Sequence, residues 1–169
     1  MEKEIFEENS RLTIRNQNFS NFDPYVEYGA VAGIIFVDCN FKGLDFTGNV
    51  IGSCDFQNCK FQNTRFWKSK FSGCRFQNCQ IMESELGRSE FESSILTNCQ
   101  FQNVDLGGSD FSSCEFTETT FENSNLNSIL FMHVDFIIFN WKSNKCLEIK
   151  NSSTRERNEL IQKLLMENS

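Results

Sequence analysis

The sequence predicts an all-β solenoid in which the chain turns a corner every five residues, and three features of its spacing support this prediction. From Phe36 to Phe136 every fifth residue is Phe, Ile or Leu, twenty-one times in succession. A small residue usually stands two positions before this apolar centre, and Gly, Asn or Ser usually stands two positions after it. A helix repeats roughly every 3.6 residues and a strand roughly every 2, so neither gives a spacing of five.

Each five-residue unit is predicted to have an inward and an outward side. Residues two apart in an extended segment point the same way, so the centre and the small residue before it both face the interior. The residue between them, such as Asp55 between Cys54 and Phe56, then faces solvent. Gly and Asn two positions after the centre tolerate the backbone angles of a tight turn. Three inward positions hold large or polar residues instead: Leu44, Ile129 and Asn49.

With these units the chain resembles the pentapeptide-repeat family, whose unit reads small residue, Asp or Asn, Leu or Phe, and two variable residues. The stretches 54–58 (Cys-Asp-Phe-Gln-Asn) and 109–113 (Ser-Asp-Phe-Ser-Ser) fit this unit. The resemblance implies a right-handed quadrilateral β-helix over residues 34–146, with four units in each coil, so that residues twenty apart stack. Each coil is then expected to pack only on its neighbours.

Before the regular repeat, residues 1–33 are expected to form an N-terminal cap with irregular first repeats. Ile14 and Phe19 are five apart but out of phase with Phe36, which predicts an irregular coil near the start of the chain. The segment from Phe22 to Ala32 then reads as an insertion that is too apolar for a solvated loop. We interpret this segment as a packed cap, with a binding loop as the alternative.

After the repeat, residues 147–169 are expected to contain a short C-terminal α-helix from about Thr154 to Met166, because Ser153 and Glu156 form a capping box. Four apolar residues form one stripe on this helix: Leu160, Ile161, Leu164 and Leu165. The stripe either covers the open end of its own rod or forms the seam of a homodimer. A resemblance to bacterial quinolone-resistance pentapeptide proteins implies the dimer.

The cysteines are predicted to be structural, and no metal or cofactor is expected. Seven of the eight occupy the small inward position: Cys39, Cys54, Cys59, Cys74, Cys79, Cys99 and Cys114. We interpret them as free buried thiols that act as small apolar fillers, with a metal ladder or a disulfide stack as the alternative. Zinc spacing is missing, since the sequence has no Cys-x-x-Cys pair and a single histidine, His133.

Charge and hydropathy exclude several classes of partner. The net charge of −7 disfavours direct binding to nucleic acid or to an anionic membrane. No apolar run approaches the roughly 20 residues of a membrane helix. The acidic N-terminus has no apolar signal region, so a cytoplasmic location is expected.

The sequence shows no catalytic constellation, and we do not expect an enzyme. His133 lies at a turn position, and no serine stands in a Gly-x-Ser-x-Gly motif. There is also no phosphate-binding loop and no dinucleotide fingerprint. A convex rod offers no cleft of the kind that catalysis requires.

Charge placement is the feature that bears on function. Five bases lie between residues 60 and 75, and acids predominate from residue 83 to residue 122. With a period of twenty, Glu85 is expected to stack on Asp105, and Glu90 on Asp110, on adjacent faces of the same two coils. These four residues are the candidate partner-binding site.

Two functions are compatible with this pattern. The favoured hypothesis is a non-catalytic scaffold or protein-interaction module with an unknown protein partner. The alternative is implied by the resemblance to quinolone-resistance proteins, namely a protein that mimics duplex DNA and binds a type II topoisomerase, DNA gyrase. In that case Glu85, Glu90, Asp105 and Asp110 stand in for phosphates, while the bases from Lys60 to Arg75 oppose binding to a basic groove.

Overall fold

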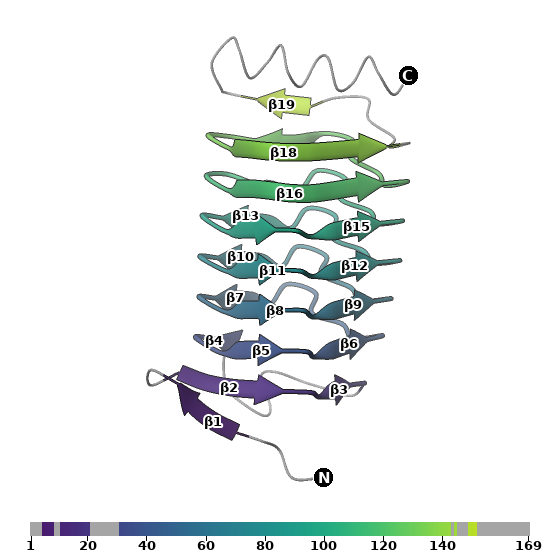
Figure 1. Ribbon diagram of the computed structural model, residues 1–169. Coiled ribbons are helices and arrows are strands. Elements are labelled where there is room, and N and C mark those ends of the chain that lie inside the picture. Colours follow the sequence, from purple (N-terminus) through teal and green to yellow (C-terminus); the bar gives the residue numbers. More distant parts are fainter. Residues whose placement is uncertain (1–4, 9–10, 21–30, 143, 145–148, 152–169) are drawn as a thin grey trace.

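The computed structural model describes residues 5–8, 11–20, 31–142, 144 and 149–151, and every regular element within these ranges is a β-strand. The strands stack into a rod, with β1 (Ile5–Glu8) at one end and β18 (Asp135–Lys142) and β19 (Ile149–Asn151) towards the other (Figure 1). The predicted all-β solenoid is therefore confirmed. The described part of the chain holds no helix that could cross a membrane.

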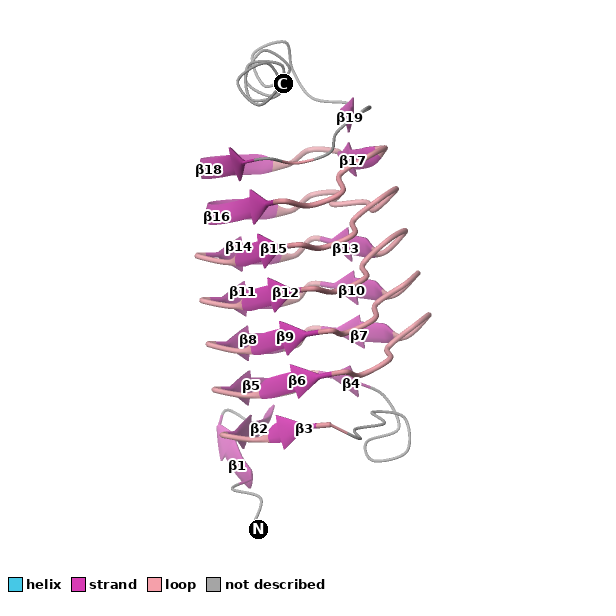
Figure 2. Ribbon diagram, turned by 90° about the vertical axis from the view of Figure 1, so that its right-hand side faces the viewer, coloured by secondary structure: helices cyan, strands magenta, loops and turns pink. Residues whose placement is uncertain are grey.

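The rod has four sides, which we name A to D in the order in which the chain visits them (Figure 2). Side A holds β2 (Arg11–Arg15), β5 (Ile35–Val37), β8 (Asp55–Gln57), β11 (Arg75–Gln77) and β14 (Ile95–Thr97). Side B holds β3 (Asn18–Phe19), β6 (Asn40–Lys42), β9 (Lys60–Gln62), β12 (Gln80–Met82) and β15 (Gln100–Gln102). The longer strands β16 (Glu115–Glu122) and β18 run across both sides.

Sides C and D complete each coil. Side D holds β4 (Val31–Ala32), β7 (Val50–Gly52), β10 (Lys70–Ser72), β13 (Glu90–Glu92) and β17 (Ile129–Phe131), and β17 pairs with β19. Side C has no strand of its own, and its coils are joined by bridges between single residues: Asp45, Arg65, Glu85, Asp105 and Asn125. Side C is therefore the irregular side of the rod.

The register of the strands is parallel, with a step of twenty residues. Phe36 pairs with Phe56, and Phe56 pairs with Phe76, so each centre lies directly over the centre of the previous coil. The first coil is longer, because Ile14 pairs with Phe36, twenty-two positions away. β1 is the exception in direction, since it folds back antiparallel on β2.

The first coil also corrects one expectation from the sequence. Val31 and Ala32 form β4, which pairs with β7 in the regular register, so the insertion expected from Phe22 to Ala32 ends before Val31. Its remaining residues, 22–30, lie outside the described residues, as does the predicted C-terminal helix. The binding-loop and capping alternatives for these segments stay predictions.

Corners form where the sequence predicts them, two positions after each centre. The backbone there is left-handed, with φ of 51–57° at the non-glycine corners and 61–71° at the glycine corners. Gly, Asn and Ser fill most of these corners, which agrees with their tolerance of this region. His133 occupies a corner as well, with φ of 52°.

The core is a stack of rings. The centres from Phe36 to Phe131 are each 5% exposed or less. Rings one coil apart lie nearly parallel, as for Phe41 and Phe61 at 4.8 Å and 6°, whereas neighbouring rings in one coil meet edge to face, as for Phe61 and Phe66 at 5.7 Å and 66°. Both arrangements are the favoured geometries of aromatic pairs.

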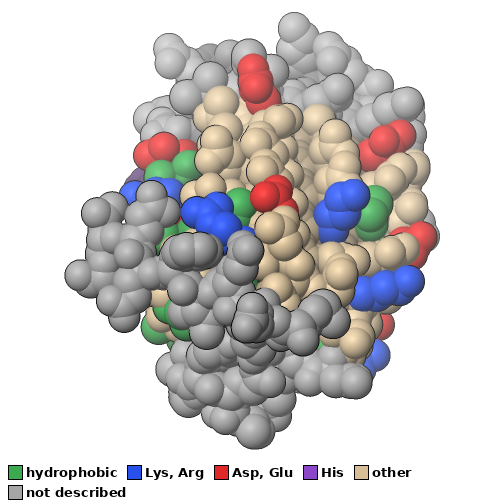
Figure 3. All heavy atoms as spheres, turned by 60° about the horizontal axis from the view of Figure 1, so that its bottom comes forward, with side chains coloured by type: hydrophobic (Ala, Val, Ile, Leu, Met, Phe, Trp, Pro, Cys, Tyr) green, Lys and Arg blue, Asp and Glu red, His purple; other side chains and the backbone are tan. Residues whose placement is uncertain are grey.

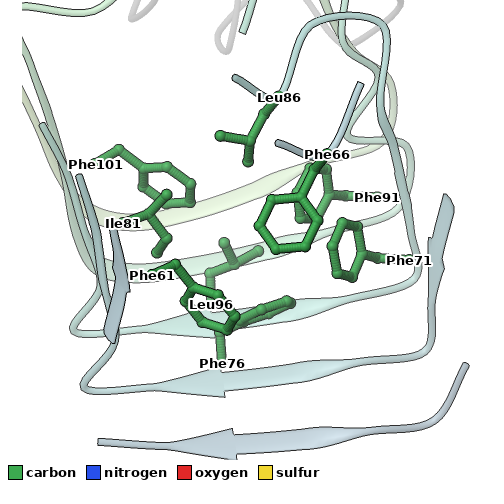
Figure 4. A pocket seen from close by; sticks show the side chains of 9 residues that line it. All are labelled: Phe61, Phe66, Phe71, Phe76, Ile81, Leu86, Phe91, Leu96 and Phe101. Atoms are coloured by element: carbon green, nitrogen blue, oxygen red, sulfur yellow. The ribbon is translucent and has the colours of Figure 1, made fainter. Parts of the chain in front are cut away.

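One of the small voids in this packing lies where aliphatic centres join the rings. It has a volume of about 10 Å³ and is lined by nine apolar side chains, among them Ile81, Leu86 and Leu96 (Figure 4). A space of this size holds at most about one water and offers it no polar partner. The interior therefore contains no ligand site here.

Candidate interaction surface

Outward side chains form ladders along the rod, because the residue twenty positions on lies in the next coil. At the corner between sides A and B, the amides of Asn58, Asn78 and Asn98 each donate to the oxygen one coil below, at 2.9–3.0 Å. The last acceptor of this ladder is Asp38. Figure 3 views the rod from its N-terminal end and shows charged side chains scattered among uncharged ones.

On side C the charge alternates over three coils of the ladder, from Asp45 to Glu85, and Asp105 then adds a second acid. Arg65 lies between two carboxylates, with its Nε 2.8 Å from Glu85 and its Nη1 3.4 Å from Asp45. Hydrogen bonds from Thr47, assisted by Arg65, hold the pKa of Asp45 below its ordinary value. All three charged side chains are about half exposed, so these ion pairs order the surface more than they stabilise the fold.

Side D repeats this alternation one corner further on. The Nζ of Lys70 lies 3.1 Å from Glu90 and 3.4 Å from Glu92, which are both in the next coil. These two carboxylates raise the pKa of Lys70, with Glu90 the larger cause. The basic run of the sequence therefore occupies one coil, and the first acids of the acidic run lie over it in the next coil.

The structure brings the four predicted site residues together in two bridged pairs. Glu85 pairs with Asp105 on side C, and Glu90 pairs with Asp110 on side D. Each carboxylate has a partner: Asp105 accepts from Asn125 at 2.7 Å and Asp110 accepts from the Ser112 hydroxyl at 2.5 Å. In sequence, Arg88 stands at the corner between Glu85 and Glu90, so a base interrupts the acids from one side to the next.

Two shallow hollows lie on this surface, and both coincide with the ion pairs. One, of about 250 Å³, is lined by residues that include Asp45, Arg65, Glu83 and Glu85. The other, of about 190 Å³, is lined by residues that include Lys70, Glu90, Glu92 and Asp110. Charged side chains that form ion pairs line part of both hollows, so the hollows offer polar contacts at the surface.

The seven cysteines of the described repeat are free and buried, as the sequence predicts. Their thiols lie near backbone carbonyls of the previous coil, as for Cys59 and Phe36 O at 3.5 Å. Burial raises the pKa of Cys54 to about 11, and that of Cys74 and Cys114 to about 12. Among the described residues no three His, Cys, Asp or Glu side chains form a group that could hold a metal ion.

One important contact was missed by the sequence analysis. Arg11 on β2 donates to the carbonyls of Gly33 and Ser53 and forms a 2.8 Å ion pair with Asp55, so it joins β2 to β8 across β5. The side chain of Asp55 is only 14% exposed, which makes this the most buried ion pair described. No sequence signal identified it, because the first coil is out of phase by two residues.

Comparisons with known proteins agree with this repeat architecture. Residues 50–129 match the family model described as a pentapeptide repeat region. No curated relative matches the sequence. The predicted cap or dimer residues Leu160, Ile161, Leu164 and Leu165 lie outside the described residues, so their role stays a prediction.

Three solved structures illustrate the likeness, all at low identity. A pentapeptide repeat protein, Rfr23, from the cyanobacterium Cyanothece 51142 is 14% identical over 75% of this chain and 94% of its own, with a TM-score of 0.28. QnrB1, a plasmid-mediated fluoroquinolone resistance protein, is 11% identical over 92% and 95%, with a TM-score of 0.36. A pentapeptide repeat protein from the Arabidopsis thaliana thylakoid lumen is 16% identical over 86% and 83%, with a TM-score of 0.34.

Proposed function

We propose, from the premise that this chain carries a pentapeptide repeat region, that it is a non-catalytic scaffold that binds a protein partner through the outer sides of its rod. Pentapeptide-repeat proteins are in general structural rather than catalytic. One observation carries the proposal: charged side chains of successive coils neutralise one another in ladders, as Arg65 does with Asp45 and Glu85. The result is a firm, patterned surface over a solid core, which is suited to recognition.

Site-specific photocrosslinking in the host cell tests the scaffold proposal. A photoreactive residue replaces Gln100 on side B in one variant and Ser72 on side D in another, both outward and away from the core. A scaffold gives a discrete adduct with a protein from one side, and excess unmodified chain competes with it. If neither side gives an adduct that the unmodified chain displaces, the scaffold proposal is wrong.

The second candidate is a DNA mimic that acts on a type II topoisomerase, and the stacking of Glu85 on Asp105 and of Glu90 on Asp110 favours it. Against it stand the bases beneath these acids and Arg88 between them. Reversing the four acids to Lys should abolish any inhibition of DNA gyrase or protection from a quinolone. Arg65→Gln with Lys70→Gln should strengthen it, because the acids lose their partners.

A supercoiling assay separates the two candidates. The scaffold proposal expects no effect of the unmodified chain on supercoiling, even in large excess, and no effect of the Gln variants. Inhibition that grows in the Gln variants and weakens with added salt would establish the mimic instead.

A further inference from the structure

A tryptophan on side C packs against the next coil. A Cβ built on Gly87 would lie 2.5 Å from Cζ3 and 2.9 Å from Cε3 of Trp67, which is closer than real atoms approach. Glycine at position 87 is therefore what leaves room for the indole ring. Trp67 is half-buried in this seat, so its orientation is set before any partner arrives.

Two basic residues flank this ring at the corner between sides C and D. The guanidinium carbon of Arg88 lies 5.5 Å from the centre of the Trp67 ring, within the range of a cation–π contact. Lys68 directly follows Trp67 in the chain and occupies the same corner one coil below Arg88. We call these three residues, Trp67, Lys68 and Arg88, the Trp67 patch.

The two corner residues of the Trp67 patch have the left-handed backbone of every corner of the rod. Lys68 and Arg88 have left-handed φ of 57° and 56°, whereas the coils on either side place Gly48 and Gly108 at the same corner. A residue with a Cβ is disfavoured in this conformation, whereas glycine adopts it freely. Two long basic side chains thus stand where glycine would stabilise the corner.

The charges of the Trp67 patch are also not used by the ladders. Arg65, Lys70 and Arg75 each lie within 3.6 Å of a carboxylate oxygen. By contrast, neither Lys68 nor Arg88 forms an ion pair with any residue that the structure describes. Within the described part of the chain, the patch therefore presents two positive charges without an ion-pair partner beside a half-buried aromatic ring.

We propose that the Trp67 patch is the docking point for an acidic peptide segment of a protein partner. One apolar side chain of the segment packs on the indole, and its carboxylates pair with Lys68 and Arg88. Trp and Arg are the residues most enriched in the energetic centres of interfaces, and a ring that is already fixed lowers the ordering cost of binding. The inference rests on the proposed scaffold function and adds the surface and the chemistry of its partner.

The surroundings of the patch favour a short acidic segment over a nucleic acid. Glu85 precedes Arg88 on side C, and Glu90 and Glu92 follow it on side D. A phosphate backbone extends in both directions and would meet these carboxylates, whereas a peptide with two acids meets only the patch. The net charge of −7 opposes a polyanion further.

The test uses the full chain with Trp141→Phe, which leaves Trp67 as the sole tryptophan. Position 141 continues the five-residue spacing of the centres, and Phe is the commonest residue at a centre, so Phe should be tolerated there. Short synthetic peptides of acidic, neutral and basic charge, each with one Leu or Phe and a fluorescent label, are titrated. The anisotropy of the label gives the dissociation constant for every variant, and the emission of Trp67 is a second readout where Trp67 is present. We expect acidic peptides to bind, and Trp67→Ala or Arg88→Glu to raise the dissociation constant by about tenfold or more.

Two further variants separate binding from folding. Lys60→Glu makes the same charge change on side B and should leave peptide binding close to that of the parent. Arg88→Gly should abolish the preference for acidic peptides and yet raise the denaturation midpoint, because it relieves the left-handed corner. A residue with a purely structural role would not give that opposite pair of effects.

Each of the following binding results would overturn the patch: peptides that bind without charge preference, equal losses from Arg88→Glu and Lys60→Glu, or tighter binding of an oligothymidylate than of any peptide. Self-association in sedimentation that acidic peptides do not compete with would also overturn it, and would make a second copy the occupant. If crosslinked partners bind the Trp67→Ala and Arg88→Gly variants normally, the scaffold function stands and only the patch fails.

Discussion

At the scale of the residue, each position in the five-residue unit has one physical task. The centre fills the core, the small residue before it is buried beside it, and the corner residue adopts a left-handed turn. These three tasks depend on local spacing alone, which is why the sequence predicts them. The consequence is that changes at a centre and at its outward neighbour should differ greatly in cost.

Phe76→Ala tests the cost at a centre. The ring of Phe76 stacks on Phe56 at 4.9 Å and meets Phe71 at 5.6 Å, and the coil ladders prevent the coils from closing a gap. We expect a loss of about 3–5 kcal/mol in the free energy of unfolding, measured by denaturant titration. Gln77→Ala, at the exposed neighbouring position, should cost little, and similar losses for both variants would contradict the inward assignment.

The buried thiols predict a pH dependence at the alkaline end. The pKa values of Cys54, Cys74 and Cys114 are raised from about 9 to about 11–12 in the fold, so the unfolded chain releases these protons first. Stability from this source is complete below pH 9. It falls by about 1.4 kcal/mol per pH unit for each thiol, from pH 9 to about 11 for Cys54 and to about 12 for Cys74 and Cys114.

Replacing these three cysteines with serine is the matched control for that prediction. Ser94 already occupies the same column and accepts a hydrogen bond from the Cys74 amide at 3.2 Å, so serine fits there. Denaturant midpoints measured from pH 8 to 11 should fall less steeply for the serine variant. Equal slopes for both proteins would show that other groups cause the alkaline loss.

At the scale of the element, the unit of organisation is the coil, because each ladder joins one coil to the next. Arg65 illustrates this, since it pairs with the coil below and with the coil above. Arg65→Glu should lower the melting temperature at low salt, because four carboxylates would then stand in one column. The loss should shrink as salt screens the repulsion.

Lys60→Glu is the control for this charge reversal. Lys60 on side B occupies the same outward position before its centre as Arg65 does on side C. It forms no ion pair with the residues that the structure describes. Its melting temperature should depend on salt much less than that of the Arg65 variant. The same salt dependence in both would show that net charge, rather than the ladder, sets the effect.

The C-terminal segment gives a further prediction at this scale, drawn from its sequence alone. If the stripe of Leu160, Ile161, Leu164 and Leu165 is a dimer seam, Leu164→Lys with Leu165→Lys should give a folded monomer. If the stripe covers its own rod, the same change should lower the melting temperature at constant mass. Light scattering of the unmodified chain should be measured first, because a monomer at micromolar concentration would exclude the dimer hypothesis.

At the scale of the whole molecule, the step of twenty residues between stacked positions explains which contacts the sequence could predict. The pairs Glu85–Asp105 and Glu90–Asp110 could be predicted, because both members of each pair lie in the regular repeat. The contacts of Arg11 were not, because the first coil is longer by two residues and the side chain reaches past a whole strand. The seat of Trp67 on Gly87 follows the same arithmetic, but only the packed ring shows why glycine is required.

The contact between Trp67 and Gly87 also implies that a deletion can preserve the core and yet change the contacts on the surface. Losing residues 70–74 keeps every centre in phase, yet it turns all later sides by a quarter and brings Glu92 over Trp67 in place of Gly87. Losing the full coil 70–89 brings Gly107 there instead and restores a seat. We expect both shortened chains to fold, with the emission of Trp67 in the Trp141→Phe background shifted only in the first. A lineage of such rods can therefore lengthen or shorten by fives and remain folded, but it keeps its pattern of contacts only when it changes by twenties.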